Sequence, residues 1–408
     1  MATEFLHQTP AEVVEDIGFC ADSCLKLDAV LRPIVHYARE MLAMEVGFIS
    51  EFSQGRRYFR VLDSDDAFCP LQLDGSDALD DSYCQRVVDG RLPHLINDAR
   101  LNAEALTLPV TLALPVAGHI SVPVRFRDGS LFGTFCCFSR RPATLTQRDL
   151  DAMYVFGDLI AQVLQSDRDV WLQRQRVRHR ILAAIRKQAW RVFLQPMYAA
   201  DDHRLLGYEA LCRFDEEPDT ERWFLDAEQA GLLAELELAC LESALEVLPS
   251  IPADRFVSFN LSPQTLMTMD ITRLPLSYAR QIVIELTEHR LVDDYASLGS
   301  ALDYLRAQGI RLAVDDAGAG FASFRHVLQL KPQLLKLDRS LISGIHNHPG
   351  QQALARALIG FSREMAILTV AEGVETVAEG ECVAALGVDL IQGYWLACPQ
   401  PVADWVVL

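Results

Sequence analysis

The sequence predicts an α/β protein in which a TIM-like (β/α)8 barrel follows a smaller α+β domain and a helical linker. From residue 190 onward, eight short apolar runs alternate with amphipathic stretches. Such a pattern over about 220 residues fits the lower end of the (β/α)8 size range. At 408 residues the chain is also too long for one ordinary core. We therefore expect a first domain at 1–165, a linker at 166–180 and the barrel at 181–408.

The first domain is expected to combine a long helix with paired strands. Residues 27–44 carry apolar side chains at helical spacing. Two strand-like runs flank Gln54-Gly55, and two more flank Arg127-Asp128-Gly129, which is a strong hairpin signal. In chain order these runs are EVGFISEF, RRYFRVLDS, GHISVPVRF and SLFGTFCCFS. Together with a closing helix they indicate an α+β layer of the kind found in sensor domains.

A long helical pattern at 145–189 connects the two domains. It carries apolar residues mostly on one face and contains no Pro or Gly after Gly157. Such a helix is either a rigid spacer or one strand of a two-stranded seam. Because most oligomers are symmetric homo-oligomers, we expect a homodimer.

The barrel strands are expected where apolar runs recur after Trp190. These runs are RVFLQPMY, LLGYEALCRF, RFVSFNLS, QIVIELTE, RLAVDD, LLKLD, ILTVAEG and DLIQGYWL. Amphipathic stretches between them predict helices at 226–247, 296–308, 351–362 and 376–385.

Composition excludes several classes of partner. The formal net charge of −19 argues against contact with a nucleic acid polymer or an anionic membrane, because both require a basic surface. The most apolar stretch, 106–124, contains three prolines and a histidine, which disfavours a membrane span. Residues 1–10 lack the pattern of a secretory signal.

The ten cysteines, including Cys20, Cys24, Cys136 and Cys137, show no zinc or disulfide spacing. They suggest small buried side chains in a cytoplasmic protein.

Polar residues follow the apolar runs of the barrel at the point where each strand is expected to end. In a (β/α)8 barrel the chemistry lies at the C-terminal ends of the strands. The residues in these positions are Glu209, Asn260, Glu285, Asp315, Asp316, Lys336, Glu372 and Gln392. Any one of them could instead cap a helix, since Asp and Asn favour that position. As a set that includes Lys336 and Glu372, they point to a reactive site.

Carboxylates gathered at a barrel mouth would repel one another unless divalent cations neutralised them. Oxygen ligands without His or Cys favour Mg²⁺ or Mn²⁺, with Ca²⁺ as a non-productive, inhibitory substitute. The adjacent pair Asp315-Asp316 could hold two metals, one carboxylate bridging both. Two hard metals a few ångströms apart are typical of phosphodiester hydrolysis, in which they activate a water and stabilise the attacked phosphate.

The barrel resembles the EAL-domain cyclic di-GMP phosphodiesterases of bacteria over about 181–401. The signature Glu209-Ala210-Leu211 has Arg213 two residues further on. Other blocks follow the family order: Gln195-Pro196, Asn260-Leu261-Ser262-Pro263, Glu285-Leu286-Thr287-Glu288, Asp315-Asp316, Lys336-Leu337-Asp338, Glu372-Gly373-Val374-Glu375 and Gln392-Gly393-Tyr394. The resemblance implies a TIM-like barrel that linearises 3′,5′-cyclic di-GMP to pGpG with two Mg²⁺ or Mn²⁺ ions.

The resemblance also implies a role for each matching residue. It makes Glu209, Asn260, Glu285 and Asp315 ligands of a first metal, and Asp315, Asp316 and Glu372 ligands of a second. It assigns Lys336, Glu372 and Gln392 to catalysis, with Lys336 orienting or deprotonating the attacking water. It makes Glu288 the brace of the loop after Asp316, and it implies substrate contacts from Gln195, Leu211, Arg213, Asp338 and Tyr394.

One loop departs from the family pattern. The family usually has Phe directly after the Asp pair and Thr before the second Gly of this loop, whereas Ala317 and Ala319 stand at these positions here. No metal ligand is lost. Because this loop couples metal binding to dimer contacts in the family, the departure bears on regulation and on basal activity.

The first domain resembles GAF domains, which bind small ligands or chromophores or dimerise. The resemblance rests on the helix, strand, strand opening, on Asp81-Ser82-Tyr83-Cys84 and on the later hairpin. Cys84 could tether a chromophore, but a small buried side chain is favoured because cysteine is among the most buried residue types. An unknown small ligand remains open for this domain.

Two functions of different classes remain open for the whole chain. One is a phosphodiesterase whose GAF-like domain sets the rate through the helical connection. The other is a receptor that holds cyclic di-GMP without cutting it and relays its presence to a partner. The complete set of metal ligands and the lysine favours the enzyme.

Overall fold

The computed structural model describes residues 21–65, 69, 71–215, 219–286, 295–317 and 324–405. The chain divides into two compact units, Met1–Gln173 and Arg174–Leu408. Helix α4, at Gln147–Lys187, contributes to both of them. Each unit has its own sheet and its own buried core, and we describe them separately.

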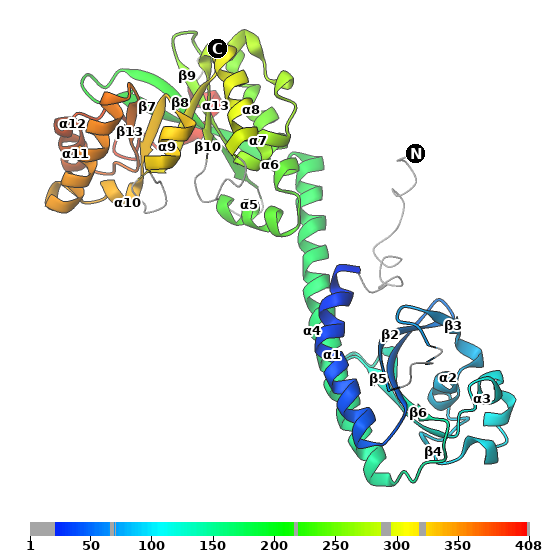
Figure 1. Cartoon of the computed structure of the whole chain (residues 1–408). Helices are drawn as coiled ribbons and strands as arrows, with labels where there is room; N and C mark the ends of the chain where they lie inside the picture. Colours follow the sequence, from blue (N-terminus) through cyan, green and yellow to red (C-terminus); the bar gives the residue numbers. More distant parts are fainter. Residues whose placement is uncertain are drawn as a thin grey trace. The chain divides into compact units, whose positions relative to one another are not determined.

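The first unit is built on one antiparallel sheet of six strands in the order β3-β2-β1-β6-β5-β4 (Figure 1). Its strands are β1 (Val46–Ser53), β2 (Arg56–Ser64), β3 (Ser76–Ala78), β4 (Leu95–Ile96), β5 (Gly118–Arg125) and β6 (Leu131–Ser139). Both expected hairpins are present. Gln54 and Gly55 have φ of 49° and 70°, which is the positive-φ pair that a tight two-residue hairpin requires.

Helices cover both faces of this sheet. Long helices α1 (Ala21–Met41) and α4 cover one face, and the short α2 (Tyr83–Val88) and α3 (Pro109–Ala113) lie over the other (Figure 1). Successive side chains of β6 point to opposite faces of the sheet, so Cys136 packs on the α2 side and Cys137 on the α1 side. The expected burial of Cys84, Cys136 and Cys137 is confirmed.

His119 on β5 is buried, and neither of its ring nitrogens has a hydrogen-bond partner among the described residues. Its ring lies 4.6 Å from that of Tyr83. Burial, together with the nearby charge of Arg57, lowers the pKa of His119 to about 3. The native first unit therefore holds this imidazole in its neutral form throughout the neutral and mildly acidic range.

We expect His119→Leu to make the first unit less sensitive to acid. The unfolded chain binds a proton at this histidine below about pH 6.5, whereas the native state does so only near pH 3. Stability is therefore lost as the pH falls between these values, by about 3 kcal/mol at pH 4. Calorimetry of the full chain from pH 7 to pH 4 should show a shallower decline of this unit's transition in the variant. An unchanged slope would contradict this account, and the exposed His179, changed to Leu, is the control.

Helix α4 runs for 41 residues without interruption, as the sequence predicted. Met153, Ile160 and Leu164 are buried in the first unit, and Ile181 and Ala184 are buried in the second. No side chain between Leu164 and Ile181 is buried. This middle stretch has the exposure that a helical linker requires.

The second unit is a closed barrel of eight strands, which confirms the expected fold class. In chain order they are β7 (Trp190–Ala199), β8 (Leu205–Phe214), β9 (Phe256–Leu261), β10 (Ile282–Leu286), β11 (Arg311–Ala317), β12 (Leu334–Leu337), β13 (Leu368–Ala371) and β14 (Leu390–Ile391). Strand β14 pairs with β7 and closes the barrel, and the short β15 (Gln400–Pro401) lies outside it on β7.

The first barrel strand differs from a regular (β/α)8 pattern. Strand β7 runs antiparallel to both β8 and β14, and no helix separates it from β8. Only five residues lie between the two strands, whereas a parallel crossover needs a dozen or more. The hairpin places Gln195 directly opposite Glu209.

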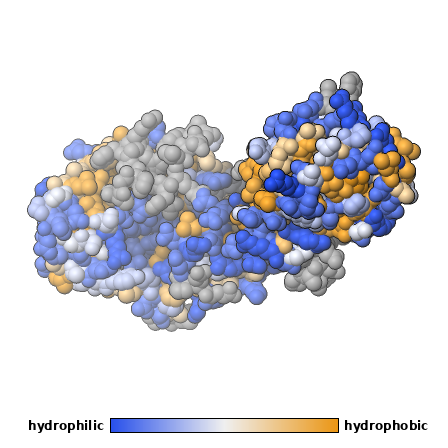
Figure 2. Space-filling model, turned by 90° about the horizontal axis from the view of Figure 1, so that it is seen from below, coloured by the Kyte–Doolittle hydropathy of each residue, from blue (hydrophilic) through white to orange (hydrophobic). Residues whose placement is uncertain are grey.

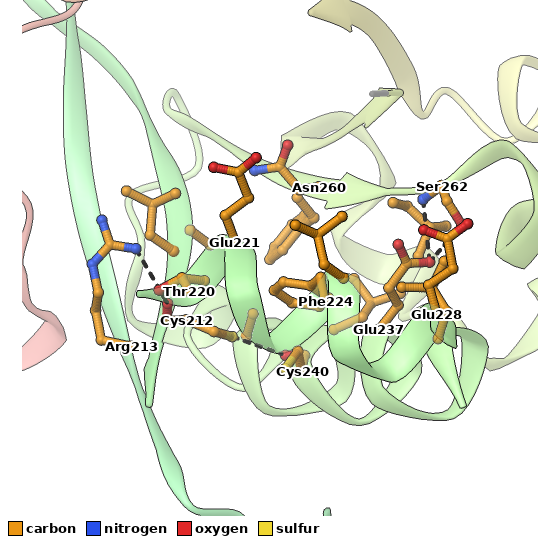
Figure 3. A pocket seen from close by; sticks show the side chains of 18 residues that line it. Cys212, Arg213, Thr220, Glu221, Phe224, Glu228, Glu237, Cys240, Asn260 and Ser262 are labelled. Carbon is orange, nitrogen blue, oxygen red and sulfur yellow. Dashed lines mark hydrogen bonds between the residues drawn. The ribbon is translucent and has the colours of Figure 1, made fainter. Parts of the chain in front are cut away.

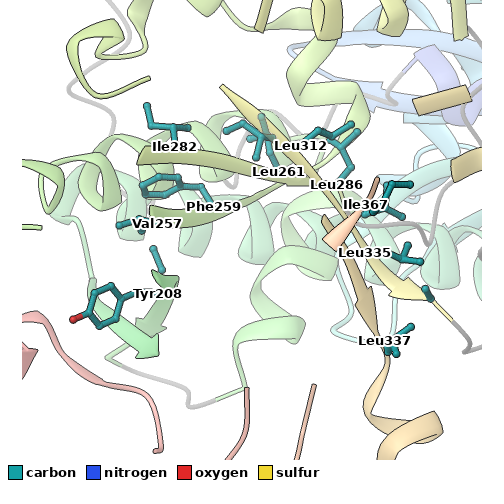
Figure 4. Close-up of a cluster of buried hydrophobic side chains, with 14 of the residues drawn as sticks. Tyr208, Val257, Phe259, Leu261, Ile282, Leu286, Leu312, Leu335, Leu337 and Ile367 are labelled. Carbon is teal, nitrogen blue, oxygen red and sulfur yellow. The ribbon is translucent and has the colours of Figure 1, made fainter. Parts of the chain in front are cut away.

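Helices surround the remaining strands. They are α5 (Thr220–Gln229), α6 (Leu233–Leu245), α7 (Pro263–Thr268), α8 (Tyr295–Ala307), α9 (Phe324–Leu330), α10 (Arg339–Ile342), α11 (Pro349–Glu364), α12 (Val377–Leu386) and α13 (Val402–Trp405). Between strands and helices lies the main core, to which Val257, Phe259, Leu312 and Leu335 belong (Figure 4). This core holds the strand ends in place.

Hydrophilic residues cover most of the face that Figure 2 shows, with hydrophobic residues gathered at several places. Among the described residues, no helix combines the length and the apolar character needed to cross a membrane.

Candidate active site

The polar residues that the sequence singled out converge at one mouth of the barrel. Strands β8 to β14 run parallel, so their C-terminal ends lie at the same side. Glu285 lies one residue before the end of β10, and Glu372 and Gln392 directly follow β13 and β14. Glu209 differs from the expectation, because β8 continues for five residues beyond it. The extension carries Leu211 and Arg213 past the mouth.

Lys336 lies at the centre of the site and is 1% exposed. Its Nζ is 2.5 Å from a carboxylate oxygen of Glu372 and 2.7 Å from one of Glu285. Oxygens of Glu209 and Asp315 lie at 3.4 and 3.5 Å. One buried ammonium group thus contacts four carboxylates from four different strands or strand ends.

Glu209 is held from two sides by amide side chains. Asn260 Nδ2 donates to one of its oxygens at 2.8 Å, and Gln392 Nε2 donates to the other at 2.7 Å. The amide oxygen of Gln392 is buried and has no hydrogen-bond partner among the described residues. A buried acceptor without a donor is unfavourable, so this oxygen is suited to a bound water.

Asp315 and Asp316 are adjacent, yet both serve the same site. Successive residues of a regular strand point to opposite faces. Here Asp316 has a φ of 58°, and the pairing of β11 with β12 shifts register between Val314 and Ala317. One oxygen each of Asp315, Asp316 and Glu372 consequently lie within 4.8 Å of one another. The positive φ of Asp316 thus brings two sequence neighbours to the same position in the site.

The electrostatics of this cluster are those of an under-compensated acidic site. Burial, with the charge of Asp315, raises the pKa of Glu372 well above its ordinary value, and burial also raises that of Glu285 to about 8. Burial opposes the charge of Lys336, but the surrounding carboxylates, Asp315 first, raise its pKa well above normal. The pKa of Glu209 is lowered, because Lys336 and the two amides outweigh its burial. More positive charge would be needed to ionise every carboxylate.

The donor set fits hard divalent cations. It offers carboxylate and amide oxygens, with no His or Cys among the residues in these contacts, and such ligands suit Mg²⁺, Mn²⁺ and Ca²⁺ rather than Zn²⁺. Asp315, Asp316 and Glu372 could hold one ion, and Glu209, Asn260 and Glu285 lie beside them. The raised pKa values and the orphaned oxygen of Gln392 are the observations that fit metal and water at this position.

A cavity of about 240 Å³ opens onto these acids. Three of the expected substrate contacts line it, namely Gln195, Leu211 and Tyr394. Arg339 and Glu375 also line it and form an ion pair of 2.6 Å, and sequence reasoning had not assigned either of them. Their signal was their place, directly after Lys336-Leu337-Asp338 and within the Glu372 block.

Residues 178–399, more than half of the chain, match the EAL domain family. The chain belongs to the EAL domain family. Residues 24–165 match the GAF domain family.

Curated relatives of the EAL domain include an uncharacterized signaling protein of Caulobacter vibrioides and the cyclic di-GMP phosphodiesterase PdeF of Escherichia coli K12. The first is 33% identical over 225 residues, which are 52% of this chain and 27% of that protein. The second is 30% identical over 189 residues, which are 44% of this chain and 25% of that protein. The chain thus spans about a quarter of the length of these two relatives.

Among solved structures, the PaMucR phosphodiesterase in its c-di-GMP complex is 25% identical, with a TM-score of 0.51. The matched region covers 57% of this chain and 100% of the PaMucR chain. The barrel is therefore similar to a phosphodiesterase domain observed with that ligand.

A second pocket of the EAL domain, of about 560 Å³, lies between β8, β9, α5 and α6 (Figure 3). Leu211 lines both this pocket and the acidic cavity, so the two adjoin. Arg213 lines the second pocket, and its guanidinium donates to the Cys212 carbonyl at 3.2 Å. The structure thus places Arg213 in the adjoining pocket and not in the acidic cavity.

Three remaining expectations concern Asp338, Glu288 and the loop that contains Ala317 and Ala319. Asp338 caps α10 by accepting hydrogen bonds from Ser340 and does not line either pocket. Glu288 and Ala319 lie outside the described residues. Ala317 is buried at the end of β11, where its carbonyl accepts from the Asp338 backbone.

Proposed function

We propose that this chain hydrolyses one phosphodiester bond of 3′,5′-cyclic di-GMP and releases linear pGpG, using two Mg²⁺ or Mn²⁺ ions. The observation that carries the proposal is the buried contact of Lys336 with four carboxylates, next to the paired Asp315 and Asp316. A site that only bound an anionic ligand would not need this density of negative charge.

In this proposal the metal ligands form two groups that share Asp315. Glu209, Asn260, Glu285 and Asp315 would hold one ion, and Asp315, Asp316 and Glu372 the other. When bound, the two ions would acidify a water and stabilise the charge that develops on the phosphate. Asn260 donates its Nδ2 to Glu209, so the amide oxygen of Asn260 is the atom that could face an ion.

Lys336 and Gln392 would act on the attacking water. The Lys336 ammonium already contacts ligands of both groups, Glu285 at 2.7 Å and Glu372 at 2.5 Å. From this position it could orient the attacking water and hold or pass on its proton. The unsatisfied oxygen of Gln392 can accept a hydrogen bond from the same water.

The substrate would extend from the acids into the adjoining pocket. Ligand sites usually measure roughly 300–1,000 Å³, and the acidic cavity alone, at about 240 Å³, is smaller than that. Gln195, Leu211 and Tyr394 would contact the part over the acids, and Arg213 a phosphate or base beyond Leu211. Arg339 joins this group as a cation at the rim.

The decisive experiment incubates the pure full chain with cyclic di-GMP and Mg²⁺ or Mn²⁺ and follows pGpG by chromatography. We expect turnover that EDTA abolishes, that either ion restores, and that Ca²⁺ inhibits. Tight binding of cyclic di-GMP with no product over hours would overturn the enzymatic proposal and leave the receptor function. If the chain neither binds cyclic di-GMP nor hydrolyses it, both the enzymatic proposal and the receptor function are overturned.

We further propose that the GAF domain regulates the barrel and that the chain forms a homodimer. The support is α4, which is one unbroken helix with residues buried in the cores of both units. Exposed apolar side chains also lie along the helices of the first unit, including Tyr37 at 63%, Val155 at 68% and Val170 at 50%. Light scattering on the full chain tests the dimer.

A further inference from the structure

Two buried thiols of the GAF domain face each other across its core. Cys84 lies in the first turn of α2, and Cys136 lies on β6. Their sulfur atoms are 3.3 Å apart, and both side chains are fully buried. The residues are 52 positions apart in the chain, so the tertiary structure brings the sulfurs together.

A buried arginine makes the two thiols unlike each other. Arg57 Nη1 donates to Cys84 Sγ at 3.0 Å, while its other nitrogens hold Asp77. Burial alone would raise the pKa of Cys84, but the hydrogen bond from Cys136 and the charge of Arg57 outweigh it and lower the pKa to about 5. Burial raises the pKa of Cys136. The surroundings of the pair therefore favour loss of a proton from Cys84 rather than from Cys136.

Small polar groups complete the surroundings of Cys136. Ser121 Oγ lies 2.9 Å from its sulfur, and Thr134 Oγ1 lies 3.2 Å from it. These hydroxyls can hold the protonated sulfur. A metal site of this kind needs at least three ligands close together. Among the described residues such a cluster is found only in the acidic site of the barrel, so the thiol pair has no third ligand for a metal.

We propose that Cys84 and Cys136 form a redox-active dithiol that a hydroperoxide converts to a disulfide linking α2 to β6. A nucleophilic thiolate next to a protonated resolving thiol is the arrangement that such chemistry requires. The proposal is independent of the phosphodiesterase activity of the barrel. Full burial restricts the reaction to small oxidants and makes it slower than oxidation of an exposed thiol.

The reaction balances in two steps. The Cys84 thiolate attacks one oxygen of the hydroperoxide, the O–O bond breaks, and a sulfenic acid forms while the departing alkoxide or hydroxide takes a proton from water. The Cys136 sulfur then attacks the sulfenic sulfur, the S–S bond forms, the S–O bond breaks, and the departing hydroxide takes the proton of the Cys136 thiol. The thiolate and the thiol lose two electrons in total, and the hydroperoxide is reduced to an alcohol, or to water for hydrogen peroxide, plus one hydroxide ion, which the buffer protonates.

The test uses the reduced full chain and hydrogen peroxide. After exposure, free thiols are blocked with N-ethylmaleimide, and the digest is read by mass spectrometry. We expect a linked pair of peptides containing Cys84 and Cys136, lighter by two hydrogen atoms than the reduced pair and lost on treatment with dithiothreitol. If Cys84 stays reduced or becomes irreversibly oxidised without a link while the exposed Cys398 reacts, the proposal is overturned.

Matched variants separate this role from simple packing. Cys137→Ser changes the neighbouring buried thiol, which faces the other core cluster and whose pKa is raised to about 12 by burial. The variant should keep the Cys84–Cys136 link, and loss of the link would count against the proposal. Cys136→Ser should instead leave a sulfenic acid on Cys84 that dimedone traps.

Arg57→Met tests the activation of Cys84, because the methionine keeps an apolar stem over Phe59, where the guanidinium now lies 4.8 Å from the ring centroid. Without Arg57 we expect roughly tenfold slower linkage at pH 7, since a smaller fraction of Cys84 would be thiolate. An unchanged rate would remove Arg57 from the mechanism and overturn the proposed site. Circular dichroism establishes that each variant is folded, and the wild-type mapping decides the proposal even if one variant is not.

Discussion

Asp315→Asn is expected to lower turnover of cyclic di-GMP by about a thousandfold or more, because each bound metal contributes several kcal/mol of charge stabilisation. Asp315 is the residue that both proposed ligand groups share. Its side chain lies within 4.8 Å of the ligand atoms of Asp316 and Glu372 and 3.5 Å from Lys336. Asparagine keeps the size of the side chain but removes the charge, so the expected loss is electrostatic rather than steric.

The measurement is kcat at saturating Mn²⁺, together with a calorimetric titration of the metal. We expect weaker metal binding and a fall in kcat. Asp303→Asn is the matched control, since Asp303 is 80% exposed on α8. Turnover within tenfold of wild type in Asp315→Asn would show that the metals lie elsewhere.

Lys336→Met is expected to give the second largest effect, and this effect falls on turnover rather than on substrate affinity. General acid–base groups typically contribute 10²- to 10⁴-fold, so turnover should fall by roughly that factor. Affinity for cyclic di-GMP should change little, because Lys336 lines the cavity with only 1% of its surface exposed and its ammonium is engaged by four carboxylates. An equal loss of binding would contradict its proposed role on the water.

The same variant should be destabilised when no metal is bound. Removing one partner of a buried ion pair typically costs about 3–5 kcal/mol, and Lys336 contacts four carboxylates at once. Mg²⁺ or Mn²⁺ should restore most of this stability, because the ions supply the missing charge. Melting curves in EDTA and in Mn²⁺ measure both effects, with the exposed Lys331 changed to Met as the control.

The strands could be predicted well from the sequence because each carries a local signal. All eight barrel runs became strands, and the two hairpins of the first unit formed where Gln54-Gly55 and Arg127-Asp128-Gly129 predicted them. The direction of β7 was not predicted. Its signal was present, since the short connection to β8 permits only a hairpin, but counting strands does not use connection length.

The candidate site was also expected from the sequence, as a row of polar residues in order. Their geometry was not, because it depends on side chains from distant positions. Lys336 as the hub, the clamp of Asn260 and Gln392 on Glu209, and the cap formed by Asp338 all require the folded chain. Arg339 and Glu375 were missed although they stand beside recognised blocks, because their pairing across 36 positions exists only in the folded chain.

Periodicity and motif order are local properties of the chain, so they are enough to predict two domains, the barrel class and the acidic residues of the candidate site. That Asp315 and Asp316 face one site follows from the folded backbone, through the positive φ of Asp316. The tertiary structure alone brought the Cys84 and Cys136 sulfurs to 3.3 Å beside Arg57. Distances of this kind arise from packing between strands and helices, which no pattern along a single chain encodes.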